Sequence, residues 1–292
     1  MKKLVIAGGT GMIGSALTEL AKSKGYMVFI LTRKPTADHH IFWNPENKAI
    51  DLDRLQGTHY IVNLTGENIA EKRWTDDRKI QLLNSRIQPN QFLAELVSAI
   101  PSLEHVVCAS GINCYGFDSG EPIHVESDQF GEDYLSQLVK AWEESTQAIS
   151  VGLTNLRISV VLSDKGGALA KMMYPMKMGL GSAIGSGKQW MSWIHITDLA
   201  ELIMFACEQK VVGPVNAVAG NSTNQDFMRA LAGVTRLPFW MPNVPSFIMQ
   251  TLYGEMSDIL LKGARSSNEL IQSRGYKFKY PTLQEAFGAL SL

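Results

Sequence analysis

Cysteine is scarce in this chain, which has only three among its 292 residues. Cys108, Cys114 and Cys207 do not follow the spacing of a metal site, and an odd, sparse set does not make a disulfide framework. Such thiols stay reduced in the cytosol. The cysteines therefore predict a cytoplasmic protein without a structural metal, in which Cys108, within an apolar run, belongs to the core.

An excess of charge of one sign is also missing. Lys and Arg number 27 against 28 Asp and Glu, so the net charge is −1. This balance argues against nucleic acid or an anionic membrane as partner, with a local basic patch as the open alternative. No apolar run is long enough to span a bilayer, and the first apolar segment is predicted to be a strand rather than a signal peptide.

The chain opens with a strand, a tight turn and a helix. Lys3–Ala7 is apolar and rich in β-branched residues, and a glycine cluster with G-x-x-G-x-x-G spacing follows. In a dinucleotide site such glycines allow a sharp turn, close approach of a pyrophosphate and tight helix–strand packing. The helix adds unpaired N–H groups for phosphate. The residues expected to bind a cofactor here are Gly8, Thr10, Gly11, Met12, Ile13 and Gly14.

The end of the second predicted strand carries Thr32, Arg33 and Lys34. An acidic residue at this point would accept a hydrogen bond from a ribose 2′-hydroxyl and repel a 2′-phosphate. A guanidinium and an ammonium instead suit a phosphate dianion, which the arginine can bind through two N–H groups. Thr32 and Arg33 therefore predict NADP rather than NAD, the alternative being that the charges are merely solvated.

Strand patterns alternate with helical patterns through the first half of the chain, which is typical of an open parallel sheet with helices on both faces. We expect an α/β fold, a Rossmann-type doubly wound parallel sheet with a smaller α+β C-terminal lobe. Strands are predicted at 3–7, 26–33, 41–43, 60–66, 105–110, 155–162, 190–198 and 214–218. Helices are predicted at 15–23, 75–99 with a kink at Pro89, 134–149, 199–208, 224–234 and 246–261.

The alternation ends near Ser163, where glycines and a methionine-rich helical stretch follow. Residues 1–162 are predicted to form an NADP-binding Rossmann domain, to which segments around 190–220 return. Residues 163–292 are predicted to form mainly a substrate lobe.

Other binding residues are expected near the ends of later strands. Leu64, Thr65 and Gly66 end the fourth strand beside the first turn, where pyrophosphate and ribose pass. Arg86, on the next helix, either points at the cofactor or is a surface charge. The candidates for substrate contact are Asn113, Arg157 and Arg265, and for the two arginines an anionic group is one reading and a surface position the other.

Several motifs resemble the extended short-chain dehydrogenase/reductases, the group that includes sugar-nucleotide epimerases and dehydratases. They are Gly8–Gly14, Asn63–Gly66, Val125–Ser127 and Trp193–Leu199. Gly66–Trp74 and Gly185–His195 are similar to an atypical branch labelled epimerase family protein, whose members end in a domain of unknown function. The resemblance implies an NADP-binding protein of unassigned substrate, and it allows a homodimer through two long helices of the Rossmann lobe.

Active members of the wider group use a Tyr-x-x-x-Lys pair, in which the lysine lowers the tyrosine pKa and holds the nicotinamide ribose. Tyr134 falls at the tyrosine position, but Leu138 stands where the lysine is expected. Lys140 lies about 200° around the helix from Leu138 and cannot replace it. A phenol with a pKa of ~10 is a poor base at neutral pH.

Ser110 and Tyr115 are the other catalytic candidates, near the C-terminal end of the fifth predicted strand. Ser110 matches the serine of the group only with a shift of one residue. Tyr115 is either a relocated acid or base or an aromatic that packs over the nicotinamide. His195 and Asp198 are predicted to link the two lobes through hydrogen bonds.

Three hypotheses follow from these residues. The first is an NADP-dependent oxidoreductase or epimerase acting on a small hydroxyl or carbonyl compound, which could be linked to a nucleotide. The second is an NADP-binding regulatory or sensor protein that has lost its chemistry, which Leu138 favours. The third, a partner in cell division or of nucleic acid, rests on a family label alone, and the near-neutral charge argues against nucleic acid.

Overall fold

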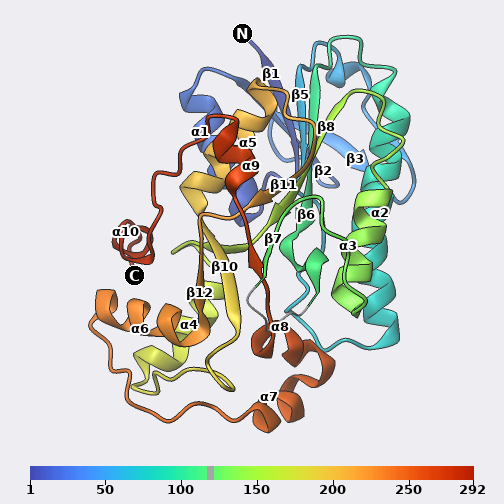
Figure 1. Ribbon diagram of the computed structural model, residues 1–292. Coiled ribbons are helices and arrows are strands. Elements are labelled where there is room, and N and C mark those ends of the chain that lie inside the picture. The colour runs from blue at the N-terminus through green and yellow to red at the C-terminus, as the bar shows by residue number, and fades with distance from the viewer. Residues whose placement is uncertain (117–121) are drawn as a thin grey trace.

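An eight-stranded, mostly parallel sheet forms the centre of the protein in this computed structural model, which describes residues 1–116 and 122–292 (Figure 1). Its strands are β1 (Lys3–Ala7), β2 (Met27–Thr32), β3 (His40–Asn44), β4 (Ala49–Ile50), β5 (Tyr60–Asn63), β6 (His105–Gly111), β8 (Gly152–Ile158) and β11 (Gly213–Ala217). Their order is β11-β8-β6-β5-β1-β2-β3-β4, and neighbours run parallel except β3 and β4. The α/β class and the Rossmann-type sheet expected from the sequence are confirmed.

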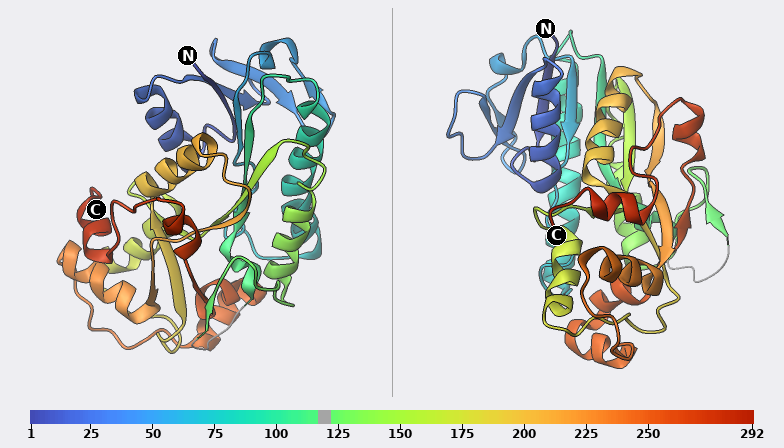
Figure 2. Two further views of the ribbon diagram at one scale, coloured as in Figure 1. Left: turned by 45° about the horizontal axis from the view of Figure 1, so that its top comes forward. Right: turned by 90° about the vertical axis from the view of Figure 1, so that its left-hand side faces the viewer.

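Helices cover both faces of this sheet. Helices α1 (Met12–Ser23) and α5 (Ile196–Glu208) lie on one face, and α2 (Asp76–Val97) and α3 (Tyr134–Glu144) lie on the other (Figure 2). Strand β1 is buried along its whole length because successive side chains meet different cores. Leu4 packs in the cluster that contains Leu17 of α1, whereas Val5 packs in the cluster that contains Phe92 of α2.

The order in which successive strands join the sheet reverses at β1, which lies between β2 and β5. Strands β2 and β3 follow on one side of β1, and β5 and β6 follow on the other. The chain leaves β1 through α1 on one face and leaves β5 through α2 on the other. In open parallel sheets this point opens a crevice beyond the carboxyl ends of the strands, where ligands bind.

A smaller lobe follows, built on a three-stranded sheet in the order β12-β10-β9. Its strands are β9 (Val160–Leu162), β10 (Trp190–His195) and β12 (Gly220–Thr223). Its helices are α4 (Gly167–Lys177), α6 (Asn224–Thr235), α7 (Ser246–Tyr253), α8 (Asp258–Leu261) and α10 (Leu283–Gly288), whereas α9 (Glu269–Ser273) packs against β11 of the large sheet. The remaining elements are β7 (Ile123–His124), which pairs with β13 (Arg265–Ser266), and the short 3₁₀ helices η1 (Asp53–Leu55), η2 (Ile112–Tyr115) and η3 (Gly254–Ser257).

The chain passes between the two sheets more than once. The single strand expected at 155–162 is wrong, because it divides into β8 in the large sheet and β9 in the small one. Ser159 lies at the division, where its Oγ donates a hydrogen bond to the carbonyl of Ala217, 2.7 Å away. After α5 the chain returns to the large sheet as β11. The boundary expected at residue 162 stays a prediction.

Some helix ends also differ from those expected. Helix α5 begins at Ile196 rather than residue 199, because the Nδ1 of His195 accepts a hydrogen bond from the N–H of Thr197 and caps the helix. The helix expected at 246–261 is interrupted at Gly254, whose φ of 60° leaves the helical region. Helix α2 continues through Pro89. No helix in the described ranges is long and apolar enough to cross a membrane.

Candidate functional site

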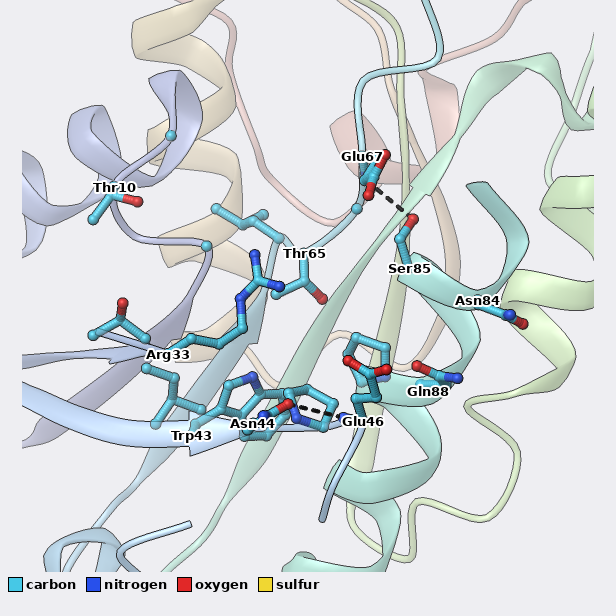
Figure 3. Close-up of a pocket in the computed structure, with 18 of the residues that line it drawn as sticks. Thr10, Arg33, Trp43, Asn44, Glu46, Thr65, Glu67, Asn84, Ser85 and Gln88 are labelled. Atoms are coloured by element: carbon cyan, nitrogen blue, oxygen red, sulfur yellow. Dashed lines mark hydrogen bonds between the residues drawn. The ribbon is translucent and has the colours of Figure 1, made fainter. Parts of the chain in front are cut away.

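A pocket of about 600 Å³ opens at the carboxyl ends of β1, β2 and β5 (Figure 3). Among the residues predicted to bind a cofactor, those that line the pocket are Gly8, Thr10, Gly11, Thr32, Arg33, Leu64, Thr65 and Gly66. Met12, Ile13 and Gly14 form the first turn of α1 next to it. The pocket also has walls from β3 and α2 that the sequence did not indicate, and these include Trp43, Asn44, Glu46, Asn84, Ser85 and Gln88.

The turn between β1 and α1 requires glycine at positions 8 and 14. Gly8 has a φ of 79°, and its carbonyl accepts a hydrogen bond from the N–H of Gly11 at 3.1 Å. A Cβ on Gly14 would lie 2.3 Å from the oxygen of Gly8, and one on Gly8 would lie 2.9 Å from the backbone oxygen of Leu64. Among the residues that the structure describes, no side chain caps the start of α1. The N–H groups of its first turn are therefore available for an anion.

Arg33 is the cation of the pocket wall. It follows the last residue of β2, is exposed, and its side chain extends into the pocket (Figure 3). Trp43, at the end of the neighbouring strand β3, also lines the pocket and is 3% exposed. The wall thus offers a guanidinium close to the end of β2, while most of the Trp43 ring is buried in the core.

The loop after β5 is fixed by an amide network. The Oδ1 of Asn63 accepts hydrogen bonds from the N–H and the Oγ1 of Thr65, at 3.1 Å and 2.6 Å. The Nδ2 of Asn63 donates to the Oδ1 of Asn90 in α2, 2.7 Å away, and both amides are buried. Because these bonds orient Thr65, the loop keeps its place in the pocket wall.

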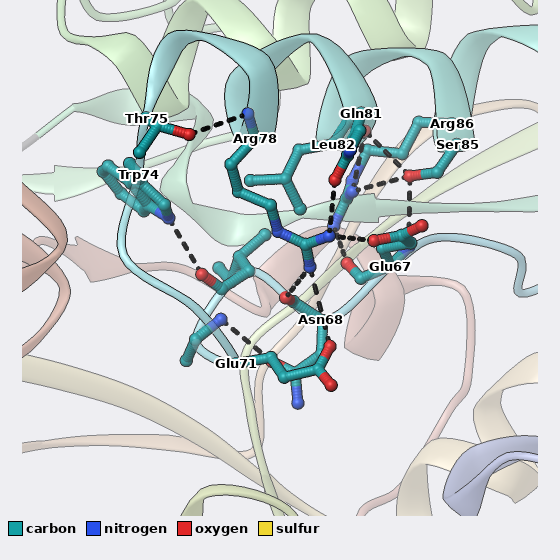
Figure 4. Close-up of polar contacts among 12 residues, drawn as sticks. Glu67, Asn68, Glu71, Trp74, Thr75, Arg78, Gln81, Leu82, Ser85 and Arg86 are labelled. Atoms are coloured by element: carbon teal, nitrogen blue, oxygen red, sulfur yellow. Dashed lines mark hydrogen bonds and ion pairs between the residues drawn. The ribbon is translucent and has the colours of Figure 1, made fainter.

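Two buried arginines of α2 hold the next part of this loop from behind (Figure 4). Arg78 forms ion pairs with Glu67 and Glu71 and donates to the carbonyl of Asn68 at 3.0 Å. Arg86 donates to the carbonyl of Glu67 at 2.9 Å.

Arg86 is therefore not a surface charge, since only 6% of it is exposed. It also does not line the pocket, which it reaches through the backbone of Gly66 and Glu67. Burial lowers the pKa of the Arg86 guanidinium to about 10. A direct contact between Arg86 and a cofactor stays a prediction.

Tyr134 is the first residue of α3, where Asp133 caps the helix through hydrogen bonds from Leu135 and Ser136. Its hydroxyl is buried and has no hydrogen-bond partner among the described residues. Its ring meets Trp74 edge to face, with centroids 5.0 Å apart. Burial raises the pKa of Tyr134 above its ordinary value, although neighbouring cations act in the opposite direction.

Ser110, Tyr115 and Arg157 lie together in a separate buried network. Ser110 Oγ donates a hydrogen bond to the carboxylate of Glu143 in α3 at 2.6 Å. The Nε and Nη2 of Arg157 donate to the same carboxylate at 2.8 Å and 2.9 Å. Arg157 also donates to the hydroxyl of Tyr115 at 2.9 Å. That hydroxyl donates to the Oδ1 of Asn216 at 2.7 Å.

In this network the hydroxyls of Ser110 and Tyr115 and the guanidinium of Arg157 are all engaged in hydrogen bonds within the chain. Burial lowers the pKa of Arg157, but the hydrogen bonds and charge of Glu143 more than offset this, so the pKa is raised overall. Burial also raises the pKa of Tyr115. Arg157 thus has its anionic partner inside the chain, and Tyr115 is protonated at neutral pH.

Asn113 and Arg265 lie elsewhere. Asn113 belongs to η2, and its backbone carbonyl accepts a hydrogen bond from Ser136 Oγ at 2.9 Å. The guanidinium of Arg265 lies 4.4 Å from the ring centroid of Trp190. Neither residue lines the 600 Å³ pocket, and their contact with a substrate stays a prediction.

Asp198 joins α5 to the C-terminal segment. Its carboxylate accepts hydrogen bonds from the N–H groups of Lys279 and Tyr280, at 2.7 Å and 3.0 Å. The ring of His195 lies 4.2 Å from that of Tyr280. Asp198 thus links α5 to the C-terminal segment through hydrogen bonds, whereas His195 caps α5 and contacts Tyr280 through its ring, so a hydrogen-bonded link by His195 stays a prediction. Within the described ranges, no three His, Cys, Asp or Glu residues cluster as metal ligands.

Comparisons with known proteins agree with this fold. A model of the NAD-dependent epimerase/dehydratase family matches residues 4–219, and a domain of unknown function, DUF1731, matches residues 244–290. An epimerase family protein of Mycobacterium bovis is 34% identical, over 98% of this chain and 96% of its own length. The Bacillus subtilis epimerase family protein YfhF is 32% identical over 98% and 97% of the two chains.

The solved structures include a human relative with a nucleotide cofactor. Human epimerase family protein SDR39U1, crystallised with NADPH, is 30% identical, has a TM-score of 0.88 and is matched over 98% of both chains. A nucleoside-diphosphate sugar epimerase of Corynebacterium glutamicum is 27% identical with a TM-score of 0.80, covering 98% of this chain and 58% of the other. MoeE5 in complex with UDP-glucuronic acid and NAD is 18% identical with a TM-score of 0.78, a likeness of fold alone.

Proposed function

This chain belongs to the NAD-dependent epimerase/dehydratase family, and we propose that it binds NADP(H) in the pocket described above and uses it on a small hydroxyl or carbonyl compound. The observation that carries the preference for NADP is Arg33, which stands in the pocket wall directly after β2. The NADPH complex of the human relative supports this preference.

The pocket fits a dinucleotide at its centre. The turn of Gly8 and Gly11 presents bare backbone to the pocket. A Cβ on Gly8 or on Gly14 would meet neighbouring backbone atoms. The uncapped start of α1 adds N–H groups and a positive dipole end. These features would hold the pyrophosphate, and Leu64, Thr65 and Gly66 would form the facing wall.

The rim of the pocket fits a phosphorylated ribose. Arg33 would bind the 2′-phosphate through two N–H groups, which lysine or a neutral side chain cannot do in the same geometry. Trp43 and Asn44 would contact the adenine from β3. No acidic residue occupies positions 32 to 34, where a carboxylate would repel the phosphate.

For chemistry, bound NADP(H) would supply or accept hydride, and the chain would move a proton. Tyr134 is the residue we assign to that transfer. A phenol is protonated at neutral pH, so Tyr134 can act as a general acid that donates its proton to a carbonyl oxygen during reduction. The buried hydroxyl has no partner among the described residues, so its proton is not held by another group.

A second candidate function is an NADP(H)-binding sensor without catalysis. Two observations favour it: Leu138 stands in place of the lysine of the Tyr-x-x-x-Lys pair, and the Ser110 hydroxyl donates a hydrogen bond to the carboxylate of Glu143. A sensor would bind NADPH tightly and never oxidise it. Incubation of the NADPH complex with a panel of small aldehydes, ketones and nucleotide-linked sugars separates the two, because only an enzyme consumes the absorbance of NADPH at 340 nm.

Calorimetric titration of Arg33→Ala with NADPH and with NADH tests the cofactor. Loss of charge-assisted hydrogen bonds to a phosphate costs about 1.5–3 kcal/mol, so NADPH affinity should fall about 10- to 150-fold. NADH affinity should change little, and Lys177→Ala, at an exposed lysine of α4 that does not line the pocket, is the control. An equal loss for NADH and NADPH would overturn the assignment of NADP.

A further inference from the structure

Helices α2 and α3 meet through two matched faces. On α2, Lys79, Leu82 and Arg86 are three and four residues apart, which places them on one side of the helix. On α3, Tyr134, Leu138 and Trp142 are each four residues apart and also share a side.

The cations of one face lie over the aromatic rings of the other. The Nζ of Lys79 is 4.9 Å from the ring centroid of Tyr134, and the guanidinium of Arg86 is 4.9 Å from that of Trp142. Between these two contacts, Leu82 and Leu138 are buried in one apolar cluster. The position that lacks a lysine on α3 is therefore bracketed by two cations that come from α2.

From this arrangement we propose that Lys79, supported by Arg86, replaces the missing lysine and stabilises the ionised form of Tyr134 during proton transfer. The inference rests on the proposed function, in which the O–H bond of Tyr134 breaks and its proton passes to the substrate oxygen. The electron pair stays on the phenol oxygen, and the nearby positive charges stabilise it. Lys79 and Arg86 are positioning residues in this sense.

Three cations, Lys79, Arg86 and Arg78, and one carboxylate, Glu255, act electrostatically on Tyr134. Lys79 has a carboxylate partner, Glu255 of η3, at 2.5 Å. Arg78 is paired with Glu67 and Glu71.

Arg86 is different, because its partners are neutral. It donates to the carbonyls of Leu82 and Glu67 and to Ser85 Oγ, and it forms no ion pair among the described residues. A buried cation without a counter-ion carries a desolvation cost, so its retention points to a role for the charge. Lys79, Arg86 and Arg78 all lower the pKa of Tyr134, whereas burial and Glu255 raise it.

The charge of Glu255 opposes that of Lys79 on Tyr134. Glu255 lies in the stretch 244–290 that matches the domain of unknown function. The contact of Glu255 with Lys79 thus reduces the stabilisation of ionised Tyr134 by the Lys79 charge. Loss of this contact should increase that stabilisation.

The test is a titration of Tyr134 that needs neither substrate nor cofactor. We would place 3,5-difluorotyrosine at position 134 in the full chain, because its phenol ionises near neutral pH, and follow ionisation by ¹⁹F NMR. Lys79→Met and Arg86→Met should each raise the pKa of this phenol, and the double variant should raise it most. A rise of one unit means about a tenfold smaller ionised fraction at a given pH.

Three further variants test whether charge near position 134 causes the change in the pKa of this phenol. Lys79→Arg should restore the pKa, because it keeps the charge. Glu255→Gln should lower the pKa, because it removes a negative charge. Lys140→Met, an exposed lysine on α3, should leave it unchanged.

An unchanged pKa in the double variant, or an equal rise with Lys140→Met, would overturn the inference. If Arg86→Met does not fold, Lys79→Met and Glu255→Gln still decide through their opposite signs. NADPH affinity is measured separately on each variant. A failure of cofactor binding would thus refute the proposed function without changing the result for Tyr134.

Discussion

Arg78 of α2 and Glu67 of the pocket wall form an ion pair in which the arginine is almost fully buried and the glutamate is half exposed. The same guanidinium donates to the carbonyl of Asn68, so one side chain holds two successive residues of the loop. The geometry of the pocket wall after Gly66 therefore depends on a residue that does not touch the pocket.

Arg78→Lys should weaken cofactor binding although it keeps the charge. An ammonium is a compact point charge and cannot reproduce the planar fork that reaches both Glu67 and Asn68. Loss of one such charged hydrogen bond costs about 1.5–3 kcal/mol, part of which should appear as a loss of NADPH affinity of about tenfold. Calorimetric titration measures it.

Glu71→Gln is the control for this prediction. The contact of Glu71 with Arg78 is longer, 3.6 Å, and the carboxylate is exposed. Exposed ion pairs contribute little, so this variant should bind NADPH like the unmodified protein. Wild-type affinity in Arg78→Lys would show that the ion pair does not position the loop.

Gly14→Ala should damage the first turn and the cofactor site together. The new Cβ would lie 2.3 Å from the backbone oxygen of Gly8 and 2.6 Å from the Cα of Gly9, so the turn must shift. We expect a loss of stability of about 2–4 kcal/mol, within the range of large single-site effects, and a loss of NADPH binding. Urea unfolding and calorimetry measure the two effects.

Gly233→Ala is the matched substitution in another helix. A Cβ at Gly233 in α6 meets nothing within 4 Å, and alanine is the better helix former. This variant should be as stable as the unmodified protein or more stable by about 0.5–1 kcal/mol. Equal destabilisation of both variants would mean that Gly14 has no special role.

The protein should lose stability as the pH falls from about 6.5 to about 4. Burial lowers the pKa of His105 to about 4 from an ordinary value of 6.5. In this window the unfolded chain binds a proton that the folded chain does not, so stability rises with pH. The shift corresponds to about 3 kcal/mol for His105, and burial lowers the pKa of His195 to about 4 as well.

Urea unfolding at pH 7 and pH 4.5 measures this loss. His105→Gln keeps a side chain that can bond to Thr154 Oγ1, the partner of His105 at 2.8 Å. The variant should therefore show a smaller difference between the two pH values than the unmodified protein. The same difference in both proteins would rule out His105 as a cause.

Asp198→Ala should detach the C-terminal segment from α5. The N–H groups of Lys279 and Tyr280 would lose their acceptors, and unpaired polar groups cost about 1–3 kcal/mol when buried. Hydrogen exchange of these two amides should become faster, and the melting temperature should fall. Asp226→Ala, which removes an exposed carboxylate at the start of α6, is the comparison. Unchanged exchange at Lys279 and Tyr280 would contradict the assigned role.

Much of the pocket lining was predictable because its parts are local. A strand, a glycine turn and a helix follow one another within Lys3–Ser23, and their chemistry is readable from residue type and spacing. Arg33 is likewise attached to the end of a predictable strand. The β–α alternation then brings the ends of β1, β2 and β5 to one edge, as parallel strands must do.

Trp43 and Asn44 were missed for a different reason. They belong to β3, which reaches the pocket only because it pairs with β2 at the edge of the sheet. An aromatic residue at a strand end is a common core residue. The short strand was predicted, but its place in the sheet depends on pairings between distant segments.

The sequence by itself determined the fold class, the glycine turn and the cation after β2, because each depends on neighbours in the chain. The tertiary structure alone decided what surrounds Tyr134. The sequence shows that Leu138 stands where a lysine is expected. It does not show that Lys79 and Arg86, about fifty residues earlier, place their cations against this helix. Charge acts through space rather than along the chain, so the packing of α2 on α3 decided whether Tyr134 has a positive neighbour.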